Sequence, residues 1–148
     1  MRNLDVYTDG GCHGNPGPGG WAYIVLDGSE KITGCGGRIS TTNNQMELTA
    51  VIEALSYIAE KHAGADVRVH TDSEYVKNGI TTWIKTWKRN GWMTSARKPV
   101  KNRELWVSLD ERVRNLTVEW VWVRGHSGNT YNEECDSLVQ TAIAETTR

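Results

Sequence analysis

Two stretches of the chain end alike, each with an aspartate that could bind a cation. Residues 6–9 (Val-Tyr-Thr-Asp) and 69–72 (Val-His-Thr-Asp) both run from strand-like sequence into Thr-Asp and then a small residue. Each pattern predicts a β-strand that carries Asp9 or Asp72 to its C-terminal end. If these strands are parallel neighbours, both side chains lie at one edge of the sheet, where open α/β sheets place their sites. Several carboxylates without a Cys/His cluster suit a hard cation such as Mg²⁺.

Two further acidic residues, Glu47 and Asp136, lie near the predicted starts of helices. Each also has a structural interpretation, because residues 44–47 resemble a capping box and an acid in the first turn of the last helix favours its dipole. Asp9 and Asp72, taken singly, suit turns. Four carboxylates that converge on one sheet edge would repel one another without a cation. A pair of divalent ions about 3.5–4 Å apart would neutralise them and drive phosphodiester hydrolysis, by activating water and stabilising the leaving oxygen.

His126 lies between two glycines in a loop at residues 123–129. A histidine can titrate near neutral pH, although a lone loop histidine is more often an ordinary surface residue. The loop joins the last predicted strand to the helix that bears Asp136. This position favours a role for His126 in proton transfer or product release.

The elements that must position these residues are strands first, followed by alternating helices and strands. We predict strands at residues 4–8, 21–26, 31–40, 67–71 and 117–123, and helices at about 44–62, 102–115 and 132–145. One or two short helices broken at Gly79 are expected within residues 74–90. This order predicts an α/β fold with a mixed sheet and helices on its faces. The length of 148 residues, without repeats or linkers, predicts a single domain over residues 1–148.

Composition narrows the class of protein. Hydrophobic residues make up 38% and charged residues 24%, as in soluble globular proteins. No apolar run could span a bilayer, and the N-terminus lacks the apolar region of a signal peptide. Three widely spaced cysteines predict free thiols in a reducing cytoplasm and no zinc site. The lack of a coiled-coil pattern or an apolar stripe favours a monomer.

Local charge predicts a polyanion partner, although the formal net charge is only −1. Residues 83–103 contain no acidic residue and hold seven basic ones: Lys85, Lys88, Arg89, Arg97, Lys98, Lys101 and Arg103. Trp83 and Trp87 share a helix face, which favours core packing. Trp92 follows Gly91 in the loop, so it is the better candidate to contact such a partner.

Residues 10–20 are rich in glycine and predict a turn. Asn15, Asn43 and Asn44 suit turn and cap chemistry. The turn lacks the Gly-Lys-Ser/Thr ending of a phosphate loop, so we expect no nucleotide cofactor.

These segments together resemble bacterial type 1 ribonuclease H. The matching segments are residues 8–12 with 14–20, 41–48, 71–76, 79–106, 125–128 and 132–136. They cover nearly the whole chain in the family's order. The resemblance implies the RNase H-like α/β fold, a five-stranded mixed sheet with helices on both faces and the first three strands antiparallel. It also implies a metal-dependent endoribonuclease that hydrolyses the RNA strand of RNA–DNA hybrids.

The resemblance also implies the roles of individual residues. It assigns binding of Mg²⁺, or Mn²⁺ as a substitute, to Asp9, Glu47, Asp72 and Asp136, and an auxiliary catalytic role to His126. It places RNA contacts on Gly10, Gly11, Cys12, Asn15, Asn43 and Asn44, whose backbone amides and side chains could bind the 2′-OH groups that distinguish RNA from DNA. DNA-strand contacts fall on Lys88, Arg89, Trp92, Lys98 and Lys101 in a basic protrusion, and on Thr42 and Asn102 in a phosphate pocket.

Two departures from the family pattern bear on substrate affinity. Met93 stands where many relatives carry Lys, and Ser40 where some use Arg. Two alternatives remain: a non-catalytic module that binds hybrids or double-stranded RNA, and another nuclease on this fold, such as an integrase or resolvase. The four carboxylates argue against the first, because clustered negative charge disfavours mere binding of a phosphate backbone. The turn at residues 14–19 and the basic tryptophan loop argue against the second.

Overall fold

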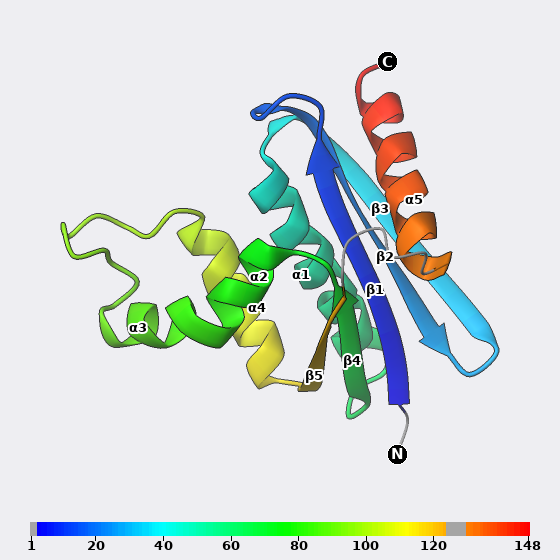
Figure 1. Ribbon diagram of the computed structural model, residues 1–148. Coiled ribbons are helices and arrows are strands. Elements are labelled where there is room, and N and C mark those ends of the chain that lie inside the picture. Colours follow the sequence, from blue (N-terminus) through cyan, green and yellow to red (C-terminus); the bar gives the residue numbers. More distant parts are fainter. Residues whose placement is uncertain (1–2, 124–129) are drawn as a thin grey trace.

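The computed structural model describes residues 3–123 and 130–148, which form one sheet flanked by helices (Figure 1). The strands are β1 (Asn3–Cys12), β2 (Gly17–Asp27), β3 (Glu30–Thr41), β4 (Asp66–Thr71) and β5 (Thr117–Trp122), in the spatial order β3-β2-β1-β4-β5. The pairs β1–β2 and β2–β3 are antiparallel, and the pairs β1–β4 and β4–β5 are parallel. The predicted five-stranded mixed sheet, with its first three strands antiparallel, is therefore confirmed.

Helices cover both faces of the sheet, as expected. They are α1 (Asn43–Lys61), α2 (Glu74–Asn78), the π-helical turn η1 (Gly79–Trp83), α3 (Ile84–Arg89), α4 (Arg103–Arg114) and α5 (Thr130–Thr146). Alternation along β1 separates the two sides, because successive strand residues face opposite ways. Leu4 and Val6 belong to the main core with α1 and α4, whereas Tyr7 belongs to a smaller cluster with Cys135 of α5. Among the described residues, no helix is long and apolar enough to cross a membrane.

The start of α1 differs from the predicted capping box. Thr42 is the N-cap, and its hydroxyl accepts a hydrogen bond from the Gln45 backbone N–H at 3.2 Å. Glu47 therefore lies in the second turn and is not the capping glutamate. Asp136 likewise lies in the second turn of α5, because that helix begins at Thr130 rather than at residue 132. Glu47 therefore does not cap α1, and Asp136 does not lie in the first turn of α5, where it would interact with the helix dipole.

The chain does not break at Gly79. The helical path continues from α2 through η1 into α3, and Gly79 itself has helical dihedrals, with φ −64° and ψ −48°. A Cβ at this position would overlap the ring of Trp106, which is fully buried in α4. The glycine is therefore required by the packing of Trp106 rather than by a helix end.

Candidate active site

The close approach of α1 to β1 brings Glu47 beside Asp9. A Cβ at Gly10 would lie 2.6 Å from the backbone nitrogen of Glu47 and would also overlap the carbonyl group of Met46. Only a residue without a side chain allows this contact, since real Cβ atoms essentially never come that close. Gly10 thus sets the distance between the strand that carries Asp9 and the helix that carries Glu47.

The parallel pairing of β1 with β4 brings the two aspartates to the same end of the sheet. Tyr7 is in register with His70, and Asp9 and Asp72 each follow two residues later. All four predicted carboxylates, Asp9, Glu47, Asp72 and Asp136, line one open cavity of about 550 Å³. They come from β1, from α1, from the segment after β4 and from α5. The structure thus gathers from four elements the acidic residues that the sequence singled out.

Negative charge is crowded in this carboxylate cavity. Burial, followed by the nearby charges of Asp72 and Asp136, raises the pKa of Asp9 from 3.8 to about 7, although a hydrogen bond from the Gly10 backbone N–H acts in the opposite direction. Burial also raises the pKa of Glu47, while a hydrogen bond from Ser73 lowers it. These carboxylates are held where their ionised forms are costly, and a cation would offset that cost.

Ser73 is a residue of this site that the sequence analysis missed. Its hydroxyl donates to a carboxylate oxygen of Glu47 and accepts a hydrogen bond at 3.1 Å from the Val76 backbone N–H, as the N-cap of α2. The same oxygen thereby starts a helix and holds a carboxylate. The sequence did hold a signal for the capping role of Ser73, because a serine directly before an acidic residue is typical of a helix start. Nothing near Ser73 in the sequence indicated its hydrogen bond to Glu47.

The chemistry of the donors fits a hard cation, because all four side chains offer carboxylate oxygens. Within residues 3–123 and 130–148, no group of three His, Cys, Asp or Glu side chains is arranged so that it could hold a metal ion. The four carboxylates therefore share a cavity without forming a ready ligand shell. His126, the remaining predicted catalytic residue, lies outside the described residues.

The predicted RNA-binding residues surround one side of the carboxylate cavity. Gly10, Gly11 and Asn44 line it directly. The Cys12 backbone N–H donates to Asn43 Oδ1 at 2.9 Å, and the Asn43 backbone N–H donates to Asn15 Oδ1 at 3.2 Å. These bonds tie the turn after β1 to the start of α1, so Asn15 and Asn43 have the structural role considered as their alternative. Their side-chain NH₂ groups have no acceptor in the described part of the chain.

The predicted DNA-binding residues form a protrusion that Figure 1 shows beside α2 and α4. Trp83 and Trp87 pack against the main core, as predicted, and Trp92 packs there as well, with its ring 6.4 Å from that of Trp87. Lys88 pairs with Asp110 at 3.3 Å. The other predicted cations of the protrusion are exposed and, within the described residues, form no ion pair: Arg89, Lys98 and Lys101.

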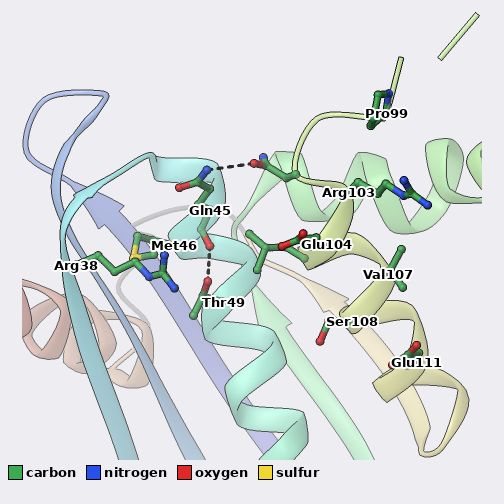
Figure 2. A pocket seen from close by; sticks show the side chains of 12 residues that line it. Arg38, Gln45, Met46, Thr49, Pro99, Arg103, Glu104, Val107, Ser108 and Glu111 are labelled. Atoms are coloured by element: carbon green, nitrogen blue, oxygen red, sulfur yellow. Dashed lines mark hydrogen bonds between the residues drawn. The ribbon is translucent and has the colours of Figure 1, made fainter. Parts of the chain in front are cut away.

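A second cavity, of about 810 Å³, lies between α1 and α4 (Figure 2). Asn102 lines it with a left-handed backbone, φ 59°, directly before α4. Gln45 reaches across from α1 and donates to Asn102 Oδ1 at 3.3 Å. Thr42, the other residue of the predicted phosphate pocket, uses its hydroxyl to cap α1.

Comparisons with known proteins agree with this fold. The RNase H family model matches residues 1–144. The ribonuclease H of Ehrlichia ruminantium (strain Gardel) is 51% identical over 145 residues, which cover 98% of this chain and 97% of that relative. The crystal structure of LC9-RNase H1, a type 1 RNase H with the type 2 active-site motif, matches with a TM-score of 0.89 and 33% identity, over 99% of this chain and 74% of that one.

A more distant neighbour, LC11-RNase H1, was solved in complex with an RNA/DNA hybrid. It matches with a TM-score of 0.75 over 98% of this chain and 99% of that one, and its 23% identity makes this a likeness of fold. The family model, by contrast, spans nearly all of the sequence, and the Ehrlichia relative is half identical over almost its full length. The chain therefore belongs to the ribonuclease H family.

Proposed function

We propose that the carboxylate cavity is the centre at which this chain cuts its substrate. Membership of the ribonuclease H family makes the chain a hydrolase, an endonuclease for the RNA strand of RNA–DNA hybrids. The observation that carries the assignment of the site is the convergence of Asp9, Glu47, Asp72 and Asp136 on one cavity. Clustered negative charge disfavours the binding of a phosphate backbone, so this convergence favours hydrolysis over a non-catalytic module.

The family depends on divalent metal ions, and we propose that Mg²⁺ serves here, with Mn²⁺ as a substitute. Asp9, Glu47, Asp72 and Asp136 would hold it, since carboxylate oxygens are the ligands that Mg²⁺ prefers. When bound, the metal supplies activation of the attacking water and stabilisation of the leaving oxygen. Ser73 keeps the Glu47 carboxylate turned toward the cavity through its hydrogen bond. His126 remains the proposed residue for proton transfer or product release.

The substrate would lie with its two strands on different sides of the carboxylate cavity. The Gly10 and Cys12 backbone N–H groups already donate to Asp9 and Asn43, so the side-chain NH₂ groups of Asn15, Asn43 and Asn44 are the stronger candidates for RNA 2′-OH contacts. Gly11 remains a candidate through its backbone.

The DNA strand would meet the exposed cations of the protrusion, together with Trp92, Thr42 and Asn102. Because Lys88 pairs with Asp110, it contributes less free charge than its neighbours. The neighbour solved with a bound hybrid supports the choice of a hybrid as partner.

The deciding experiment offers the protein four substrates: RNA–DNA hybrid, RNA duplex, DNA duplex and single-stranded RNA. Each is incubated with Mg²⁺ and, separately, with EDTA. We expect cleavage of the RNA strand of the hybrid alone, and only with metal. Equal cutting of the DNA duplex, or cutting of the hybrid in EDTA, would overturn the proposal.

The role of the carboxylates is tested by Asp9→Asn, which keeps the shape of the side chain and removes its charge. We expect loss of cleavage with hybrid binding retained. The matched control is Asp5→Asn, on the same face of β1, where the carboxylate pairs with His70 at 3.0 Å and lies away from the cavity. A fully active Asp9→Asn variant would refute the metal assignment.

We also propose that residues 1–148 act as one monomeric domain in the cytoplasm. Support for one domain comes from α1, α4 and α5, which all pack on a single sheet. Support for a reducing compartment comes from Cys12, Cys35 and Cys135, which are all free thiols. Light scattering of the purified protein tests the monomer, and a dimeric mass would refute it.

A further inference from the structure

A chain of side-chain hydrogen bonds links α4 to the end of β3. Thr41 Oγ1 donates to Gln45 Oε1 at 2.8 Å, and Gln45 Nε2 donates to Asn102 Oδ1 at 3.3 Å. Asn102 Nδ2 in turn donates to the Tyr75 hydroxyl at 3.0 Å, and the same hydroxyl accepts a bond from Trp106 Nε1 at 3.0 Å. In Figure 2 a dashed line marks the hydrogen bond that the side-chain amide of Gln45 donates. Five side chains are thereby joined into one series.

The series bridges the carboxylate cavity and the cavity between α1 and α4. Tyr75 lines the carboxylate cavity, whereas Gln45 and Asn102 line the cavity between α1 and α4. Gln45 also lies only two residues before Glu47 on α1. The position of the Asn102 amide is therefore tied to the same elements that carry the carboxylates.

The bonds on both sides of Asn102 hold its amide in one orientation. A primary amide has two N–H donors and a carbonyl acceptor. Here the carbonyl is used by Gln45 and one N–H by Tyr75, and the described residues provide no acceptor for the second N–H. If Asn102 alone turned over, its NH₂ group would face the Gln45 NH₂ group, with two donors opposed. The present orientation leaves one N–H for an acceptor outside the protein.

We infer that Tyr75 and Gln45 are positioning residues for the DNA strand, because they hold the Asn102 amide with one N–H ready for a phosphate oxygen. The inference rests on the proposed function, in which Asn102 contacts the DNA-strand backbone. Tyr75 contributes by accepting from Asn102 with a hydroxyl that Trp106 already holds in place. Gln45 contributes by bonding the Asn102 carbonyl, which would otherwise repel a phosphate.

The test compares Tyr75→Phe and Gln45→Met with Asn102→Ala. Hybrid binding is measured in EDTA by fluorescence anisotropy, and KM and kcat are measured with Mg²⁺. Loss of one directed hydrogen bond predicts a rise of about 5- to 10-fold in Kd and KM for Tyr75→Phe, with little change in kcat. Tyr57→Phe is the matched control, since it removes a hydroxyl from the C-terminal half of α1 and should bind like the unmodified protein. Circular dichroism at the assay temperature verifies that each variant is folded.

The decisive comparison is the double variant Tyr75→Phe/Asn102→Ala. If Tyr75 acts through Asn102, the double variant binds no more weakly than Asn102→Ala alone, because coupled residues are not additive. Additive losses, or a Tyr75→Phe variant that binds like Tyr57→Phe, would overturn the inference and leave the role of Asn102 intact. Unchanged binding by Asn102→Ala would instead overturn the proposed phosphate contact and the inference with it.

Discussion

Removal of the Asp9 charge should make the metal-free protein more stable at neutral pH while it abolishes activity. The pKa of Asp9 is about 7 in the folded protein against 3.8 ordinarily, chiefly because of burial and then because of Asp72 and Asp136. Below pH 3.8 the carboxyl is protonated in both the folded and the unfolded state and costs nothing. As the pH rises from 3.8 to 7, the unfolded state ionises first, so stability is lost progressively across this window.

The magnitude follows from the size of that pKa difference. At about 1.4 kcal/mol per pH unit, ionised Asp9 costs the fold up to about 4 kcal/mol at pH 7 and above. Asp9→Asn keeps the shape and the acceptor for the Gly10 N–H but carries no charge, so we expect a gain of about 2–4 kcal/mol at pH 7.5 in EDTA. The gain should disappear near pH 4.

The assay is urea unfolding of both proteins in EDTA at pH 4, 6 and 7.5, followed by circular dichroism. Asp5→Asn serves as the control, since Asp5 lies outside the carboxylate cavity. Mg²⁺ should stabilise the unmodified protein and not Asp9→Asn, because a ligand stabilises only the state that binds it. A variant less stable than the unmodified protein at pH 7.5, or a gain that does not depend on pH, would refute the reasoning.

Four other changes test separate parts of the structure. Gly10→Ala should push α1 away from β1 and lower kcat/KM by about 100-fold, since a displacement near 1 Å can cost this much; an unchanged rate would show that the close approach is not needed. Gly79→Ala should lower the free energy of unfolding by about 1–3 kcal/mol in urea titrations, because its Cβ overlaps Trp106; unchanged stability would contradict that packing. His126→Ala should slow turnover without ending it, and a rate like that of the unmodified protein would exclude proton transfer. Replacing Arg89 and Lys98 by Gln should lower the slope of log Kd against log salt by about 0.7–0.9 for each phosphate that is no longer neutralised; an identical slope would remove them from the DNA path.

Much of the fold could be predicted because its signals are local. The alternating patterns before Asp9 and Asp72 predict two strands, and the structure has both residues two positions past a matched pair of β1 and β4. The predicted end of the first strand at Asp9 is wrong, because residues 10–12 go on pairing with β2 and β1 ends at Cys12. The helical spacing after residue 44 predicts α1, which the structure extends by one residue to Asn43 because Thr42 is the cap. Periodicity and caps depend on neighbours in the chain, so they can be read without the tertiary structure.

Predictions from local patterns were wrong where the role of a residue depends on a side chain that is distant in the sequence. The segment before Glu47 suggested a capping box, but Thr42 caps the helix and Ser73, 26 positions along the chain, holds the Glu47 carboxylate. Gly79 suggested a helix break, but it makes room for Trp106. Lys88 stands in a stretch of sequence without acidic residues, yet in the structure it pairs with Asp110 of α4. Each outcome depends on a residue distant in sequence, which no local pattern identifies.

The sequence by itself determined the family, the order of elements and the four acidic residues, because residue types and short-range spacing carry that information. Only the tertiary structure decided how those acids meet: Gly10 lets α1 approach β1, and burial together with the neighbouring carboxylates raises the pKa of Asp9. It also decided the hydrogen-bond series that links Tyr75 to Asn102. These are properties of distance and burial between elements. They arise only when the chain has packed, since close approach and desolvation do not exist in an extended sequence.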